Sequence, residues 1–435
     1  MASKISKVST QPSSSTQPNV SGSSDYNSHE ENNQLVITTK RKTKSREEDD
    51  ERRGFLCVKP GHHVNDYELI KNLGQGSYGT VWLTKHTEAE TYTAMKISRS
   101  SEFLRRLARR EITILEDLDS LPHPNIVKFL DSFIWEENRL EHVVMTFEVL
   151  GPDLKSVISN SGQKLHLEVV KSITRQLLEA ISYMHNLNYV HVDIKASNVM
   201  LAISKNDIKN LASSQDMTCN RYDINVTRAD ARIVAKLADF GLAFNMDENL
   251  NSYPQSNCIF RAPEQILTTR VTTAVDMWSF GCLIHQIVAG SNLFACKKYN
   301  SIPDHNSRHF MLMDHLLGPI KQADFQEGFR EKFANKFDEN GNMTVPVIDE
   351  FLPTCYETAI QFGMTDEEAE EYSDFLVLFF KYNTAERITA DAAIRHNFLR
   401  SNGDTPAVPH LSLEYPETDI GEESNKVIPL PGDKE

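Results

Sequence analysis

Apolar and polar residues alternate in short runs through the first third of the ordered part of the chain. The segments 69–73, 81–83, 92–97 and 143–150 are rich in Val, Ile, Leu, Phe and Met and are separated by glycine or polar residues. Short runs of this kind, bounded by turn residues, indicate strands. We therefore predict a β-rich region that begins near Tyr67 and ends near Leu150.

Apolar residues at helical spacing dominate the rest of the chain. The segments 102–118 and 167–187 each place such residues on one face, and the apolar segment 276–290 ends in a glycine, a common helix stop. The residues that define the two faces are Leu104, Leu107, Ile112 and Leu115 in the first segment and Val170, Ile173, Leu177, Ile181 and Met184 in the second.

Three segments lack either pattern. Residues 1–53 are rich in Ser, Thr, Gln and Asn and then in mixed charge, so they cannot bury enough apolar surface to order, and we predict disorder. The basic cluster 40–44 within them is either a nuclear-import signal or a solvated charge run balanced by the acids of 47–51. Residues 204–233 are polar and read as an inserted loop, and 401–435 as a flexible acidic tail.

Composition narrows the class of protein. The chain has 435 residues, 40% of them hydrophobic and 25% charged, and a formal net charge of -15, which argues against non-specific binding of nucleic acid. Its six cysteines form no CxxC pair, so we expect reduced thiols.

The N-terminus is polar and the longest apolar runs, such as 375–380, are too short to cross a bilayer. We expect a soluble monomer of the cytoplasm, the nucleus or both, with no contact to membrane.

The stretch 189–201 contains candidate chemistry. It holds a carboxylate, an amine and an amide at fixed offsets, Asp193, Lys195 and Asn198. Phosphoryl transfer needs such a set: an acid to orient the attacking hydroxyl and accept its proton, a cation to neutralise phosphate charge, and an amide oxygen to hold a metal. The alternative is a polar turn in which the three residues meet by chance.

A glycine-rich hairpin provides a second signal. Residues 74–81 fit the pattern G-x-G-x-x-G-x-V, whose backbone can approach phosphates closely. The pattern lies between two predicted strands rather than before a helix, which disfavours a dinucleotide-binding fold. A plain glycine turn is the alternative.

These motifs, taken in order with Asp239-Phe-Gly241, Ala262-Pro-Glu264 and Arg387, resemble the protein kinases. The resemblance implies an α+β fold of two lobes, a small β-rich lobe to about residue 150 and a mostly helical lobe over 151–400, with ATP between them. A catalytically inactive scaffold is the alternative from another class, but it would have lost Lys96, Asp193, Asn198 or Asp239.

By this resemblance each motif receives a role. Asp193 and Lys195 are catalytic, and Asn198 and Asp239 hold Mg²⁺. Lys96 binds the α- and β-phosphates and forms an ion pair with Glu111, which follows it by about fifteen residues. The residues expected around ATP are Leu73, Gly74, Gln75, Gly76, Ser77, Tyr78, Gly79, Thr80, Val81, Ala94, Lys96, Glu111, Phe147, Glu148, Leu150 and Met200.

Supporting residues are implied in the same way. Asp276 is expected to bond the backbone of the catalytic loop, Glu264 to pair with Arg387, and Phe240 to pack inward. We interpret His191 as a packed structural residue, because the neighbouring Asp193 suits the role of base.

Finer features resemble the SR-protein kinases, in the group that also contains the cyclin-dependent, MAP and CDC-like kinases. Arg261 before Ala-Pro-Glu and the long insert of about 294–374 are marks of the group. The segments 145–151 and 364–376 and the position of the 204–233 insertion are nearer to the family. The resemblance implies basic or Arg/Ser-rich protein substrates, and a CDC-like kinase with other substrates is the alternative.

The docking groove of that family uses acids to hold arginine-rich substrate. Asp314 matches one such acid, while Ser307 and Arg308 stand where acids are expected. The chain also has Cys258-Ile-Phe260 before the arginine and Asp-Phe-Gly in place of Asp-Leu-Gly. Asp314 is therefore either a remnant of a docking groove or a surface acid.

Val192 replaces the arginine that precedes the catalytic aspartate in kinases switched by phosphorylation. Valine offers neither charge nor donor to a phosphate. The segment 245–258 carries Ser252, Tyr253 and Ser256 together with the acids Asp247 and Glu248, whose charge would repel a neighbouring phosphate. We predict an enzyme active as synthesised, with this segment held by packing and local hydrogen bonds. Should a cation replace the missing arginine, Arg261 and Arg228 are the candidates.

Overall fold

The computed structural model describes residues 35–38, 53–160, 164–214, 216, 219–248, 250, 253–295, 304–325, 327–346 and 352–400. All of them belong to the unit Gln34–Glu435 of the chain. The basic cluster 40–44, Ser252 and the tail 401–435 lie outside the described residues.

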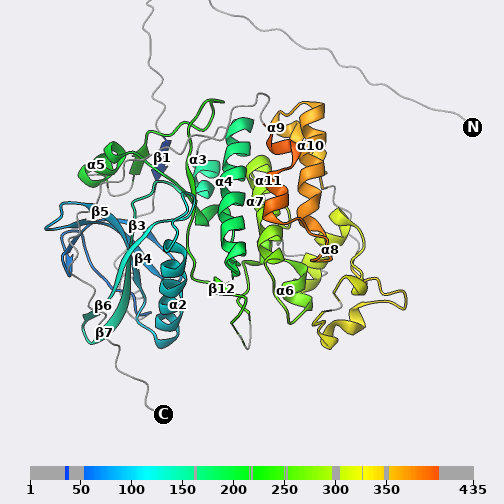
Figure 1. The fold of residues 1–435 in the computed structure, drawn as a ribbon, viewed down its shortest axis with the longest axis horizontal. Helices are drawn as coiled ribbons and strands as arrows, with labels where there is room; N and C mark the ends of the chain where they lie inside the picture. The colour runs from blue at the N-terminus through cyan, green and yellow to red at the C-terminus, as the bar shows by residue number, and fades with distance from the viewer. Residues whose placement is uncertain are drawn as a thin grey trace, which may run out of the picture. The chain divides into compact units, whose positions relative to one another are not determined.

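A six-stranded antiparallel sheet forms the first lobe (Figure 1), with the strand order β2-β3-β4-β5-β7-β6. Its hairpin of β3 and β4 is closed by the glycine-rich segment. One face buries Leu69, Trp82, Met95 and Val144, and the other packs on the rest of the molecule through Val143 and Met145. The strands are β2 (His63–Val64), β3 (Tyr67–Gln75), β4 (Gly79–His86), β5 (Tyr92–Ser98), β6 (Phe129–Glu137) and β7 (Leu140–Phe147).

The helix α2 (Glu102–Asp119) lies beside this sheet and confirms the helix predicted over 102–118 (Figure 1). It begins at Ser101, whose hydroxyl accepts a hydrogen bond from the backbone N–H of Leu104 at 3.2 Å, an N-cap. Its buried face is apolar except for Glu111. A carboxylate on a buried face needs a partner, so Glu111 marks the point where the helix meets polar chemistry.

Helices make up most of the second lobe, around α4 and α7. Both were predicted, and α7 ends at Gly290 with a φ of 67°, the left-handed C-cap that favours glycine. The α-helices of this lobe are α3 (Leu154–Asn160), α4 (Leu167–Asn186), α6 (Pro263–Leu267), α7 (Ala274–Ala289), α8 (His305–Leu317), α9 (Cys355–Phe362), α10 (Asp366–Val377) and α11 (Ala390–Ile394).

Short strand pairs and 3-10 turns connect these helices. The pair β9 and β11 and the pair β8 and β12 are antiparallel and flank the catalytic loop and the segment that begins at Asp239. They are β8 (Tyr189–Val190), β9 (Val199–Leu201), β11 (Ala235–Leu237) and β12 (Phe244–Asn245), and the 3-10 turns are η1 (Ala196–Asn198), η2 (Cys258–Phe260), η3 (Gln322–Phe325), η4 (Glu331–Lys336), η5 (Leu378–Phe380) and η6 (Asn397–Leu399).

The insertion after β9 is more regular than the sequence predicted. In place of a loop it forms the helix α5 (Lys205–Ser213), followed by the strand β10 (Cys219–Tyr222). A capping box starts α5, in which Ser204 and Asp207 bond each other's backbone N–H groups. The helix packs Leu211 against Leu83 and Val149 of the first lobe. Tertiary packing thus stabilises a nine-residue helix that would be marginal alone.

β10 pairs with a strand that lies inside the range expected to be disordered. This strand, β1 (Leu35–Thr38), runs antiparallel to β10 with Leu35 opposite Tyr222. The sequence did not predict this strand, because the residues around it are polar and its pairing partner lies far away in the sequence.

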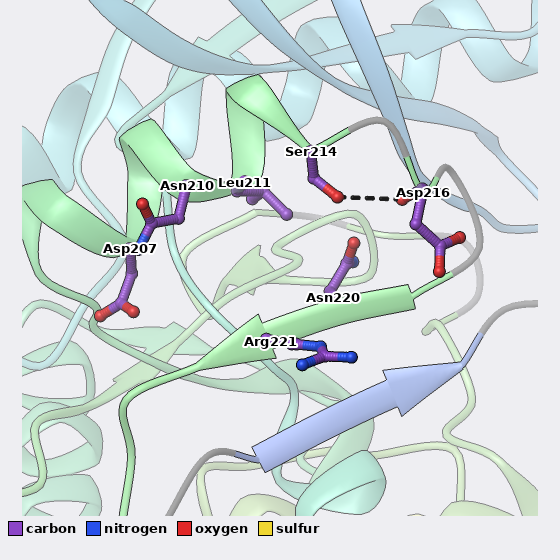
Figure 2. A pocket seen from close by; sticks show the side chains of 7 residues that line it. All are labelled: Asp207, Asn210, Leu211, Ser214, Asp216, Asn220 and Arg221. Carbon is purple, nitrogen blue, oxygen red and sulfur yellow. Dashed lines mark hydrogen bonds between the residues drawn. The ribbon is translucent and has the colours of Figure 1, made fainter. Parts of the chain in front are cut away.

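The insertion also lines an open pocket of about 380 Å³ beside α5 and β10 (Figure 2). Lys71 of β3, which is buried, reaches this region and donates a hydrogen bond to the backbone oxygen of Asp216 at 2.8 Å. The residues that line the pocket are Asp207, Asn210, Leu211, Ser214, Asp216, Asn220 and Arg221.

Within the described ranges, no helix has both the length and the apolar character needed to cross a membrane.

Candidate active site

The catalytic loop between β8 and β9 brings together the three groups that the sequence singled out. Lys195 Nζ donates to Asp193 Oδ2 at 2.5 Å. Asn198 Nδ2 donates to the backbone oxygen of Asp193 at 2.9 Å and to its Oδ2 at 3.0 Å. Because Asn198 uses its nitrogen toward Asp193, its amide oxygen is the atom that a metal would contact.

Asp276 of α7 holds the backbone of this loop, as predicted. Its Oδ2 accepts from the N–H of His191 at 2.8 Å and its Oδ1 from the N–H of Val192 at 2.7 Å. Val192 has a φ of 71°, a left-handed conformation that is rare for a β-branched residue and costs about 1–3 kcal/mol. The buried Asp276 therefore stabilises a strained loop next to Asp193.

His191 is a packed residue, in agreement with the prediction. It is fully buried, its ring centroid lies 5.0 Å from that of Phe240, and its Nε2 is 3.3 Å from the backbone oxygen of Ala238. Burial lowers the pKa of His191 against the attraction of Asp276, so the ring is neutral near pH 7. Phe240 is also buried and packs inward, as expected.

A lysine with two carboxylates lies across the two lobes. Lys96 Nζ donates to Glu111 Oε1 at 2.7 Å and to Oε2 at 2.8 Å, so the predicted ion pair is present. The same nitrogen donates to Asp239 Oδ1 at 3.0 Å. The three residues join β5, α2 and the segment after β11.

Lys96 and Asp239 are charged at neutral pH, whereas burial raises the pKa of Glu111 against the attraction of Lys96. Burial opposes the charged form of Lys96, but the attraction of Asp239 and Glu111 outweighs it and raises the lysine pKa. The ammonium of Lys96 in turn holds the pKa of Asp239 below its usual value, against the effect of burial. Asp239 is therefore a carboxylate, with a left-handed φ of 63°.

The glycine hairpin has a defined conformation above this group. The N–H of Gly76 donates to the oxygen of Gly79 at 2.9 Å, and Arg99 donates through its N–H to Tyr78 O at 2.9 Å and through Nη1 to Ser77 O at 3.1 Å. A Cβ at Gly79 would lie 2.1 Å from the oxygen of Ile97, so this position requires glycine.

Tyr78, at the tip of the hairpin, lies close enough to Asp239 and Asp193 for their charges to act on its hydroxyl. Its pKa is raised, first by partial burial and then by the charges of Asp239 and Asp193. Its hydroxyl therefore stays protonated at neutral pH.

The remaining residues expected around ATP lie on both sides of the junction between the lobes. Gly74 is paired with Val81 across the hairpin, and Ala94 with Phe147 between β5 and β7. Thr80 departs from the expectation in one respect. Its hydroxyl lies 3.2 Å from Trp82 Nε1, on the face opposite Val81, so only its backbone faces the hairpin interior. The other members of the set are Leu73 and Gln75 on β3, Leu150 in the connection after β7, and Met200 on β9.

Glu148, one of the residues expected around ATP, uses its side chain elsewhere. Its Oε1 accepts from Lys236 Nζ at 2.7 Å and from the N–H of Lys128 at 2.7 Å. Lys236 is buried on β11, where it is paired in register with Met200. This lysine was not predicted, because its only signal in the sequence is a charge inside a short apolar strand.

The described residues of the activation segment 244–261 make contacts that the sequence did not specify. β12 pairs with β8, and Arg110 Nη2 of α2 lies 2.9 Å from Glu248 Oε2. Ser256 is buried, its hydroxyl lies 3.0 Å from Gln265 Oε1, and its backbone oxygen accepts two hydrogen bonds from Arg261.

Three further predicted residues have defined partners. Arg387 forms a buried two-point ion pair with Glu264, at 2.5 Å and 3.0 Å, as expected. Asp314 on α8 accepts from the N–H of Ile320 at 3.2 Å, a contact that supports the helix end. Arg228, one of the two candidate cations for the activation segment, pairs instead with the neighbouring Asp230.

The donors present fit a magnesium nucleotide. Asp239 is an ionised carboxylate and Asn198 presents an amide oxygen, both hard oxygen ligands of the kind Mg²⁺ prefers. Lys96 and the open backbone of the hairpin provide cationic and N–H groups for phosphates.

These groups define a phosphotransferase site of the protein-kinase type. A model of the protein kinase domain matches residues 67–399, so the chain belongs to the protein kinase family. The expected α+β fold of two lobes and the serine/threonine kinase class, with a resemblance to the SR-protein kinases, are confirmed at this level.

Three kinases are similar to the chain over most of its length. It is 28% identical over 395 residues to "Serine/threonine-protein kinase SRPK" of Physarum polycephalum, covering 80% of this chain and 89% of that protein. It is 27% identical to "Dual specificity protein kinase CLK4" of Homo sapiens, covering 77% of this chain and 66% of the relative. "Serine/threonine-protein kinase AFC3" of Arabidopsis thaliana is also 27% identical, with coverages of 77% and 82%.

Proposed function

We propose that the chain is an active protein kinase that transfers the γ-phosphate of ATP to serine and threonine hydroxyls of protein substrates. The observation that carries the proposal is the closed contact of Lys96 with both Glu111 and Asp239. A kinase needs this lysine and the metal-site carboxylate in place at the same time. An inactive scaffold has no need to maintain either contact.

The positions of the site residues indicate a separate role for each in phosphoryl transfer. Asp193 orients the substrate hydroxyl and accepts its proton through the carboxylate that Lys195 and Asn198 hold in position. Lys195 and Lys96 provide positive charge where negative charge develops. Asn198 and Asp239 would hold Mg²⁺, which when bound neutralises phosphate charge. Glu111 keeps Lys96 in reach of the phosphates.

The test is phosphorylation of a basic, serine-rich protein with Mg²⁺ and ATP. The wild-type chain should incorporate phosphate on serine or threonine, and Asp193→Asn should lower kcat by at least a hundredfold. Asp230→Asn, at an exposed acid paired with Arg228, is the matched control and should match the wild type. Equal phosphorylation by the wild type and Asp193→Asn would refute the role of Asp193.

For the substrate we propose basic, Arg/Ser-rich proteins. The net charge of -15 favours basic partners, and the relative from Physarum polycephalum is named "Serine/threonine-protein kinase SRPK". A CDC-like specificity is the second candidate, because Ser307 and Arg308 on α8 replace acids and the CLK4 relative is nearly as similar. A peptide array with Arg-Ser repeats, Ser-Pro peptides and acidic peptides separates the two. Preference for acidic peptides would contradict both.

Other expectations remain predictions. A monomer without nucleic-acid binding, located in the cytoplasm or nucleus, is consistent with the composition. Sedimentation of the full chain would test whether it is a monomer, and imaging of a tagged copy would test its location.

A further inference from the structure

Three side chains of the kind that bind metals meet outside the active site. One ligand atom from each of Cys258, His305 and His309 lies within 4.8 Å of the others. Cys258 is the first residue of η2, the 3-10 turn that ends directly before Arg261. The two histidines lie one turn apart on α8. Tertiary structure therefore brings the thiol of the activation segment to the imidazoles of the insert.

The separation of the two imidazoles matches that of a metal-bound pair. Their Nε2 atoms lie 3.3 Å apart. Two nitrogens bound to one tetrahedral zinc ion at about 2.0–2.1 Å lie about 3.4 Å from each other. Histidines at positions i and i+4 of a helix also present their rings on one face, as in helical zinc motifs.

The thiol lies near the position of a third ligand. A nitrogen and a sulfur bound to the same zinc ion lie about 3.6 Å apart, and the ligand atoms here lie within 4.8 Å of one another, so the thiol would need to move by about 1 Å at most. Cys258 is half-buried and carries a thiol rather than a disulfide. One side-chain rotation covers such a distance.

The hydrogen bonds set the protonation of the two rings. Arg308 Nη2 lies 3.2 Å from His305 Nδ1, and a guanidinium only donates, so the proton of a neutral His305 is on Nε2. That proton faces His309 Nε2, which must then carry a lone pair directed into the cluster. His309 is 1% exposed, and its Nδ1 has no hydrogen-bond partner among the described residues, so the ring is oriented by packing together with the contact of its Nε2 to His305.

We propose that Cys258, His305 and His309 form a binding site for a divalent transition-metal ion, with Zn²⁺ as the best fit. A thiolate with two imidazoles is a borderline-soft donor set, which favours Zn²⁺ over Mg²⁺ or Ca²⁺. Arg261 and Arg308 act electrostatically on His309, so the thiolate provides the negative charge that a cation needs here. A bound ion would link η2 to α8.

The structure also indicates what opposes binding. A metal on His305 Nε2 moves the ring proton to Nδ1, and the hydrogen bond from Arg308 must then break. Arg308→Gln, which removes the fixed positive charge and its forked donors, should therefore raise the affinity for Zn²⁺ by about threefold or more. An unchanged or weaker affinity would show that Arg308 does not compete with the metal.

Titration of the metal-free full chain with Co²⁺ tests the site by absorption spectroscopy. A thiolate bound to Co²⁺ gives a ligand-to-metal charge-transfer band, whereas the oxygen donors Asn198 and Asp239 give none. We expect one such site per chain, displaced by one equivalent of Zn²⁺. Cys258→Ser should abolish the band, and Cys57→Ser, at an exposed thiol, should retain it. Absence of the band in the wild type, or its persistence in Cys258→Ser, overturns the proposal.

A second variant tests the histidines without relying on the thiol. His305→Ala should weaken Zn²⁺ binding at least tenfold in competition with a chromophoric chelator. Asn306→Ala, at the neighbouring position on α8, should bind like the wild type. A loss of less than threefold in His305→Ala excludes this ring as a ligand, and a matching loss in Asn306→Ala indicates damage to α8 instead.

Discussion

Arg110 of α2 and Glu248 of the segment after β12 form an ion pair across 2.9 Å. Arg110 directly precedes Glu111, the carboxylate that holds Lys96, so the pair connects the activation segment to the helix that positions the phosphate-binding lysine. In kinases switched by phosphorylation, a phosphate orders this segment through arginine contacts. Here a genetically encoded carboxylate is in contact with an arginine of α2.

We predict that Glu248→Gln lowers kcat/KM by about 1.4-fold to fivefold. The pair is partly exposed, and such pairs contribute about 0.2–1 kcal/mol, which sets this range. Steady-state kinetics at low salt measure the effect, which should shrink at high salt. Glu327→Gln breaks the exposed pair with Arg270, far from the active site in sequence and contacts, and should leave kcat/KM unchanged. An identical loss of kcat/KM in Glu248→Gln and Glu327→Gln would show that the contact with α2 does not affect activity.

Asp276→Asn should reduce kcat about tenfold to a hundredfold while KM for ATP changes little. The amide of asparagine can accept one of the two N–H groups that Asp276 now binds, and its own N–H₂ would face the other. The strained Val192 would then relax and displace Asp193. Pre-steady-state phosphoryl transfer measures the chemical step, and the control is Asp391→Asn on α11. A normal rate in Asp276→Asn would show that packing alone maintains the loop.

His285 should make the fold sensitive to mild acid. It is buried on α7, and burial lowers its pKa to about 4, from about 6.5 in the unfolded chain. Between these values the unfolded state binds the proton, so stability is complete above pH 6.5 and falls as the pH decreases toward 4. From pH 7 to pH 5 the loss is about 2 kcal/mol.

Urea unfolding at pH 7 and pH 5 measures this contribution. His285→Gln, which does not titrate, should lose about 2 kcal/mol less than the wild type between the two pH values. Replacement of the exposed His315 by Gln is the control and should change the pH dependence little. Equal pH dependence in the His285 variant and the wild type would place the acid sensitivity elsewhere.

The enzyme should be active without phosphorylation of the segment 245–258. Ser256 is buried against Gln265, so its hydroxyl is inaccessible while the segment is folded, and Val192 offers no cation for a phosphate. We predict that Ser252→Ala combined with Tyr253→Phe keeps kcat/KM within about threefold, a change below ~0.7 kcal/mol. Kinetics of bacterially produced protein, with phosphate content from mass spectrometry, measure it. A hundredfold loss, with activity of the wild type dependent on an upstream kinase, would contradict the prediction.

The sequence predicted those contacts that depend on residue type at a fixed offset. Lys96 with Glu111, Asp276 with the catalytic loop and Arg387 with Glu264 are all present. In each case a buried charge needs one particular partner, so the residue types reveal the pair.

Contacts that depend on how separate segments meet could not be predicted. Arg110 with Glu248 and Glu148 with Lys236 are ordinary charged residues in the sequence, and only tertiary structure selects their partners. The helix α5 is an intermediate case. Its capping box at Ser204 and Asp207 is visible in the sequence, but the short helix depends on the first lobe for stability.

The pairing of β1 with β10 has a consequence for any shortened form of the enzyme. A chain that starts at residue 54 would contain every kinase motif, yet it would lack the strand that bonds β10. The N–H and C=O groups of β10 would then face solvent as an unpaired edge, which is a template for association with other chains. β1, which lies in the polar N-terminal region, thus covers the edge of β10. Deletion of β1 would appear first as self-association of the enzyme and not as loss of catalysis.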